Sequence, residues 1–184
     1  MLDVFGFPSP QEANYQEFYG GGTVRDWVKP RGASMVRMLL IGAGAGGGGG
    51  TSTAGTGGGS GAVTQWIGPA IFIPDVLRIF LGAGGASAAA GGNTTIIYQA
   101  KDGTGYTLLT ANGATGGVTA GAASSNNYFG ASGIFKSIAG QDGGLPGVSI
   151  SASSNTFLSG GAGGGNATGN DGAQVACNYG YPAI

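Results

Sequence analysis

Runs of glycine alternate with short apolar segments along most of this chain, and this alternation constrains its fold more than any other feature. Glycine accounts for 43 of the 184 residues, against about 7% in an average protein. Each glycine in a regular element costs roughly 0.5–1 kcal/mol relative to alanine, because its backbone loses more freedom on folding. Since the net stability of a domain is only about 5–15 kcal/mol, a fold with this composition must use something that glycine alone provides.

That property is the close approach of backbones, which lets main-chain N–H and C=O groups bond to one another. We therefore expect a tightly packed, backbone-bonded assembly, most simply a homo-oligomer, with a trimer as the favoured form. A flexible linker is the alternative, but linkers lack the Trp, Ile and Leu that lie between these glycine runs. The 7 prolines and the missing Gly-X-Y period exclude collagen.

The apolar segments predict an all-β domain, a compact β-sandwich or jelly roll with long glycine-rich loops and little helix. The loops are expected either as plain loops or as polyproline-II-like segments. Asp102-Gly103 between two β-rich runs predicts a hairpin. Pro69 and Pro74 exclude a central strand between them. Strands or short apolar patches are expected at Thr23–Lys29, Ser34–Ile41, Ala62–Ile67, Val76–Leu81, Asn93–Ala100, Tyr106–Ala111, Ile134–Ile138 and Val148–Ile150.

Residues 1–20 differ in composition from residues 21–184, which form the glycine-rich β domain. This N-terminal arm is rich in aromatic residues and allows a short helical turn at Gln11–Tyr19. Two interpretations stay open: the arm packs back on its own domain, or it docks into a neighbouring subunit as an anchor. The anchoring residues are expected to be Leu2, Val4, Phe5, Phe7, Tyr15, Phe18 and Tyr19.

The residues that carry enzyme chemistry are scarce. Histidine is absent, Cys177 is the single cysteine, and the eight acidic residues are scattered, so no catalytic residues, metal or cofactor are expected. Gly42–Gly47 follows a strand like a dinucleotide fingerprint, but more glycine follows where that fingerprint requires a helix.

The formal net charge of −1 provides no electrostatic footprint for nucleic acid. We also expect no membrane span, because no 18-residue apolar window occurs, and cytoplasmic synthesis, because no secretory signal is present.

Two clusters of Tyr and Asn are candidates for contact with a polysaccharide or protein receptor, because adaptable recognition loops use these residue types. The simpler interpretation is that their aromatic rings cover a thin core. The residues are Asn126, Asn127, Tyr128, Tyr179 and Tyr181.

The segment Trp27–Gly32, followed by Met35–Gly42 and the glycine run, resembles the glycine-rich domain of bacteriophage virion proteins. The resemblance continues in the order of elements over residues 23–165. It implies a non-enzymatic structural protein of the virion, made in the host cytoplasm. Because little chain accompanies the domain, we expect a small capsid decoration or appendage (head fibre) protein, attached by its arm to virion proteins such as the major capsid protein. The alternatives are a receptor-binding adhesin tip of a tail fibre, which recognises a host glycan or protein, and a secreted matrix protein.

Overall fold

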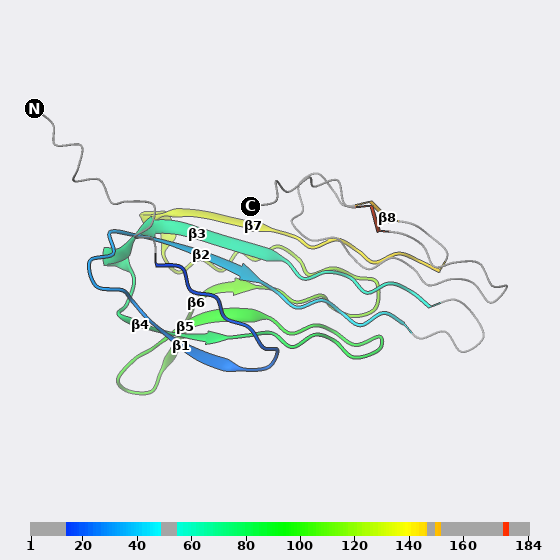
Figure 1. The fold of residues 1–184 in the computed structure, drawn as a ribbon, viewed down its shortest axis with the longest axis horizontal. Coiled ribbons are helices and arrows are strands. Elements are labelled where there is room, and N and C mark those ends of the chain that lie inside the picture. Colours follow the sequence, from blue (N-terminus) through cyan, green and yellow to red (C-terminus); the bar gives the residue numbers. More distant parts are fainter. Residues whose placement is uncertain (1–13, 49–54, 147–149, 152–174, 177–184) are drawn as a thin grey trace, which may run out of the picture.

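A computed structural model describes residues 14–48, 55–146, 150–151 and 175–176. Two antiparallel sheets dominate it (Figure 1), which confirms the all-β expectation. The first sheet has the strand order β1-β4-β5-β6 and the second the order β2-β3-β7; β8 and β9 form a short parallel pair. The strands are β1 (Val24–Val28), β2 (Met35–Ile41), β3 (Val63–Pro69), β4 (Val76–Phe80), β5 (Thr94–Gln99), β6 (Gly105–Ala111), β7 (Ile134–Ile138), β8 (Ile150–Ser151) and β9 (Val175–Ala176).

The core lies between the two sheets because alternate residues of each strand point inward. Trp66 of β3 is fully buried and stacks on Phe129 with ring centroids 4.5 Å apart. A Cβ added to Gly68 or Gly133 would lie within 2.7 Å of the indole ring, so both glycines make room for it. The buried cluster joins residues from both sheets: Met38, Leu40, Trp66, Ile73, Leu77, Ile79, Ile96, Leu108, Leu109 and Ala111.

The β5–β6 hairpin forms where Asp102-Gly103 predicted it. Gly103 has φ +87°, a left-handed conformation that glycine adopts without strain. The Thr104 amide donates to Asp102 Oδ1 at 2.9 Å, and this backbone hydrogen bond is the main cause that lowers the pKa of Asp102 below its ordinary value. The turn therefore favours the ionised carboxylate.

The short helical turn that the sequence allows at Gln11–Tyr19 is not present over the described part of that segment. Residues 14–20 have no helical assignment, whereas residues 11–13 lie outside the described part of the chain. The segment runs along the open side of the sandwich toward the start of β1 (Figure 1). Phe18 packs against the core cluster, so this half of the arm belongs to the domain. The helical structure of the described residues consists of two single 3₁₀ turns, η3 (Ala70–Phe72) and η4 (Gly130–Ser132).

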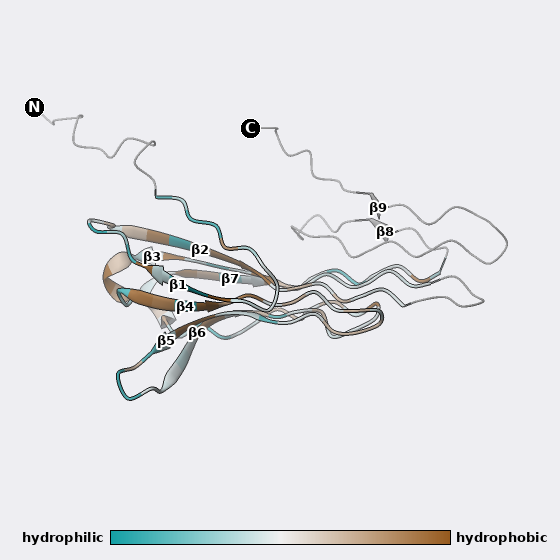
Figure 2. Ribbon diagram, turned by 60° about the horizontal axis from the view of Figure 1, so that its bottom comes forward, coloured by the Kyte–Doolittle hydropathy of each residue, from teal (hydrophilic) through white to brown (hydrophobic). Residues whose placement is uncertain are grey.

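Beyond one end of the sandwich, the chain continues in long extended segments that lie side by side (Figure 1). We call these segments the glycine bundle and the opposite end of the sandwich the base. Figure 2 shows the two sheets converging where the strands pass into the pale, weakly hydrophobic bundle. The described parts of the glycine bundle are residues 42–48, 55–62, 81–93, 112–122 and 139–146.

Hydrogen bonds within the bundle recur every third residue. Along 42–48 and 55–62, each step of three residues on one segment is matched by three residues back on the other. Three-residue spacing is that of the polyproline II helix, whose turn contains three residues. Among these bonds, Gly42 N donates to Ala62 O, Ala45 N to Gly59 O, Thr56 N to Gly48 O, Ala43 N to Gly92 O, Gly46 N to Ala89 O, Gly57 N to Gly144 O and Ser60 N to Gln141 O.

Steric contact explains why glycine is required here. A Cβ added to Gly46 would lie 1.7 Å from Ala86 O, and one added to Gly58 would lie 2.1 Å from Ala45 O. Such separations are far inside van der Waals contact. The close backbone approach predicted from composition therefore occurs within one chain, so glycine content alone no longer requires an oligomer. The homo-oligomer stays a prediction.

Candidate docking surface at the base of the sandwich

An exposed apolar surface at the base is the most distinctive feature outside the core. It lies where the β1–β2 and β3–β4 connections meet, it includes the strand ends beside them, and its residues are between 51% and 84% exposed. The two connections are hydrogen-bonded to each other, because Lys29 N donates to Asp75 O and Ala70 N to Ser34 O. We define the base surface as Val28, Met35, Ile71, Phe72 and Val76.

The sequence builds this surface around the turn η3. Pro69 and Pro74 bracket the segment, so it cannot extend either neighbouring strand. Ala70 and Ile73 are buried and hold the turn against the core, and Ile73 N closes it by donating to Ala70 O at 3.1 Å. Ile71, between them, is 84% exposed. The turn thus presents Ile71 and Phe72 to solvent from a fixed backbone.

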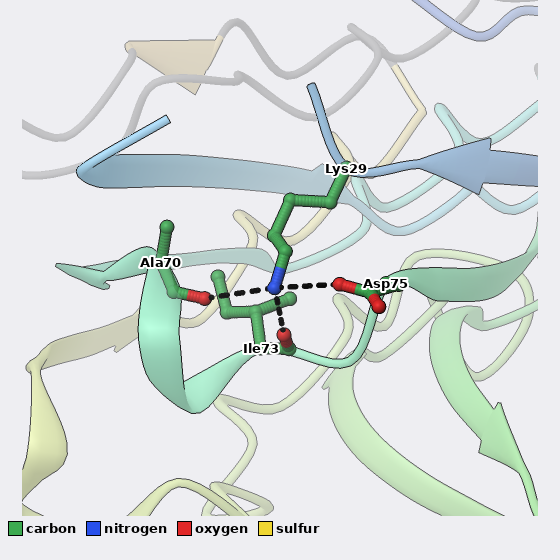
Figure 3. Close-up of polar contacts among 4 residues, drawn as sticks. All are labelled: Lys29, Ala70, Ile73 and Asp75. Carbon is green, nitrogen blue, oxygen red and sulfur yellow. Dashed lines mark hydrogen bonds and ion pairs between the residues drawn. The ribbon is translucent and has the colours of Figure 1, made fainter. Parts of the chain in front are cut away.

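Lys29 holds this turn in place through three polar contacts (Figure 3). Its Nζ lies 2.8 Å from Ile73 O, 3.3 Å from Ala70 O and 2.9 Å from Asp75 Oδ1. The Lys29 side chain is only 21% exposed, whereas that of Asp75 is 86% exposed. Solvent screens an exposed carboxylate strongly, so the two carbonyl contacts contribute more to the position of the turn than the ion pair does.

The β1–β2 connection next to the base surface also holds a cation, Arg31, that has no partner among the described residues. Lys29 pairs with Asp75, and Arg78 pairs with Asp26 on the outer face of the first sheet. Arg31 is exposed in the turn that follows β1 and has no hydrogen bond or ion pair within the described residues. An approaching anionic group would therefore meet an unneutralised guanidinium beside apolar side chains.

The anchoring residues predicted in the arm divide into two groups. Tyr15 and Tyr19 are exposed and both donate hydrogen bonds to Glu17, and the bond to Glu17 is the main cause that raises the pKa of Tyr15. Phe18 packs inward instead. The remaining anchors, Leu2, Val4, Phe5 and Phe7, lie outside the described residues.

Of the predicted receptor-contact residues, the two asparagines form side-chain hydrogen bonds within the fold. Asn126 Nδ2 donates to Thr110 Oγ1, and the Asn127 side chain accepts from Phe129 N and donates to Gly130 O. Tyr128 is 64% exposed, and its ring lies 6.3 Å from that of Tyr106. The amides therefore shape the turn that presents Tyr128. Tyr179 and Tyr181 lie outside the described residues.

Sequence reasoning did not nominate Ile71 or Phe72. The signal was present, because four apolar residues between two prolines cannot join a strand and still need a place in the fold.

Over the described ranges, no group of three or more His, Cys, Asp or Glu is arranged to hold a metal ion. Within the same part of the chain, no helix has the length and hydropathy needed to cross a membrane.

The comparison with known proteins identifies a family for this chain. No curated protein and no solved structure matches the chain. One family model, described as a glycine-rich domain, matches residues 19–183. The match begins within the arm, close to Phe18, and includes both sheets and the glycine bundle. The chain therefore belongs to the glycine-rich domain family.

Proposed function

We propose that this protein is a non-enzymatic structural component of a bacteriophage particle, a small capsid decoration or appendage protein. The observation that carries the proposal is the two-ended build of the molecule. An apolar surface lies at the base, and the glycine bundle projects from the other end. Such a molecule suits attachment at one end and display at the other.

The base supports the attachment half of this proposal. Exposed apolar side chains that gather in one part of a protein commonly mark sites of protein association, and five such side chains lie at this end of the sandwich. The described part of the arm begins near this end of the sandwich (Figure 1). The anchoring arm and the base surface would then act together at the site of attachment, which is expected to involve the major capsid protein or another virion protein.

The bundle supports the display half. Its segments are joined by backbone hydrogen bonds, and many of its glycines cannot accept a Cβ. A structure fixed in this way changes little in shape when its surroundings change, which is an advantage for a part that projects into solvent.

A receptor-binding adhesin tip is the second candidate function. The exposed pair of Tyr128 and Tyr106 favours it, because tyrosine provides a large rigid contact area at low entropic cost. In this case the partner is a host surface glycan or protein.

Particle incorporation tests the primary proposal. The full chain, carrying a tag, is expressed in the cells that encode it, and particles are purified from their lysate on a density gradient. We expect the chain to sediment with particles, and a variant without residues 1–13 to stay in the soluble fraction while keeping its β-sheet circular dichroism. A full chain absent from purified particles would contradict a virion role. Binding of purified chain to host cells, lost in Tyr128→Ser, would instead favour the adhesin.

A further inference from the structure

We propose that the base surface binds the segment Leu2–Phe7 of a second copy of this chain, so that neighbouring copies are linked by exchanged arms. The inference rests on the proposed placement of the arm and the base at the attached end, and it names the contact between them; a virion protein would then meet the base with the exchanged arm in place. It is carried by three features: the apolar base surface, the point at which the arm leaves the sandwich, and the distribution of charge.

The base surface has the character of an unpartnered interface. Ile71 and Phe72 project from a turn whose backbone is held by Lys29 and by the buried Ala70 and Ile73. Because this support is rigid, little conformational entropy is lost when a partner covers the turn. The segment Leu2–Phe7 is a suitable occupant in composition, since four of its six residues are large and apolar.

The path of the arm favours a neighbouring copy over the same chain. Followed from Gly20 back to Asn14, the chain runs along its own sandwich toward the base (Figure 1). The described chain therefore begins near the base and is directed there away from the bundle, which suits an acceptor on a copy that adjoins the base. Pro8 and Pro10 favour an extended backbone at the residues that precede them. Six residues lie between Phe7 and Asn14, and the seven steps from one residue to the next span roughly 23 Å in extended form.

The charges of the N-terminal arm are complementary to those of the rest of the chain. All 7 Lys and Arg residues lie between Arg25 and Lys136, whereas the arm contains Asp3, Glu12 and Glu17 and no cation. Arg31 is exposed beside the base surface with no partner in the described part of the chain. Asp3 lies within the docking segment, so a docked arm brings a carboxylate to a surface with an unneutralised guanidinium.

Mixed cysteine cross-linking tests this exchange on the full chain. In a Cys177→Ser background, one preparation carries Phe5→Cys with one tag, and another carries Ile71→Cys with a different tag. We expect a covalent heterodimer after mild oxidation of the mixture, visible on a non-reducing gel and removed by dithiothreitol. The matched control replaces Ile71→Cys by Ile41→Cys, which is exposed at the bundle end of β2, and should give no heterodimer.

A single chain that carries both Phe5→Cys and Ile71→Cys separates the alternatives. An internal disulfide without heterodimer in the mixture would mean that each arm covers its own base, and the proposal would be wrong. The absence of both products, or an equal heterodimer yield from the Ile41→Cys control, would also overturn it. Ile71 is exposed, so its replacement removes no core side chain, and circular dichroism checks that both variants fold.

A charge exchange provides a second readout. Asp3→Arg alone and Arg31→Asp alone should each shift the sedimentation coefficient toward the monomer, and the double variant should shift it back. Recovery in the double variant supports pairing of Asp3 with Arg31 across copies. A double variant that is no more associated than either single variant would contradict that pairing.

Discussion

The sandwich and the glycine bundle are stabilised in different ways within one continuous chain. In the sandwich, large side chains such as Trp66 and Leu109 fill the space between two sheets. In the bundle, adjoining segments are so close that backbone atoms occupy the positions that side chains would need. The same strands pass from one region into the other, so one chain uses apolar burial at one end and main-chain hydrogen bonding at the other.

This difference determines which substitutions each region should tolerate. A sandwich core accepts many apolar replacements of similar volume. In the bundle, a single methyl group at Gly46 or Gly58 would meet a carbonyl oxygen with no free space. Alanine, ordinarily the most conservative replacement for glycine, should therefore be among the most disruptive changes there.

The largest expected effect is in the sandwich. Trp66→Ala removes a fully buried indole and its contact with Phe129, and a change of this kind typically lowers the free energy of unfolding by about 3–5 kcal/mol. Urea denaturation followed by circular dichroism measures the loss. Ile71→Ala, at an exposed position, is the control and should change stability by less than about 0.5 kcal/mol. Equal effects of the two variants would contradict the position of the core.

The second-largest effect is expected in the bundle, where two glycines differ in the space that is available for an added Cβ. Gly58→Ala places a methyl group against Ala45 O, whereas a Cβ at Gly84 has no atom within 4 Å. We expect Gly58→Ala to destabilise by about 1–3 kcal/mol and Gly84→Ala to be neutral or stabilising by about 0.4–1 kcal/mol. Because both replacements restrict the unfolded chain equally, their difference isolates the steric clash. Similar denaturation midpoints would show that the segments do not pack as described.

A smaller effect is expected at the base, where Lys29 holds the turn η3. Lys29→Met keeps the apolar stem but removes the hydrogen bonds to Ala70 O and Ile73 O, which should cost about 1 kcal/mol. Asp75→Asn removes only an exposed ion pair and should cost less. Thermal unfolding compares the two variants. If Asp75→Asn proves the more harmful, the ion pair and not the carbonyl contacts holds the turn.

The smallest effect concerns pH at the β5–β6 hairpin. The Thr104 amide lowers the pKa of Asp102 below its ordinary value of 3.8, so the folded hairpin binds this proton less readily than the unfolded chain. The contribution of the Asp102 carboxylate to the free energy of unfolding is fully present above the ordinary pKa. It is lost as the pH falls through the lowered pKa of the folded hairpin. The protection factor of the Thr104 amide, which is its intrinsic exchange rate divided by the observed rate, should fall over this range. Asp102→Asn should abolish the pH dependence, and a pH dependence that persists would assign it to another group.

The strands of the first half of the chain were largely predictable because they contain apolar runs between turn residues. Ser34–Ile41 gave both the existence and the approximate bounds of β2, whereas Ile134–Ile138 was identified only as a short apolar patch and proves to be β7. Asp102-Gly103 gave the hairpin, since few other residues adopt its turn. Composition also predicted close backbone contact.

The sequence did not reveal which backbones are in contact. Glycine has no side chain whose polarity could show which way a residue faces, so a run such as Gly46–Gly50 contains no pattern that identifies its neighbours. Contact within one chain and contact between chains were therefore indistinguishable. The base surface was missed for a different reason: Ile71 and Phe72 have the composition of core residues, and only the fold shows that they point outward.

The three-residue spacing of the bundle restricts how its length can change. Because each segment meets the same neighbour once per turn, an added or deleted block of three residues moves every later donor by one whole turn, about 9 Å. One or two residues instead rotate the remainder of the segment, so that alanines face carbonyl groups where glycines stood. Viable natural variants should therefore differ in loop length by multiples of three, and matched blocks inserted on adjoining segments would lengthen the projecting part in discrete steps.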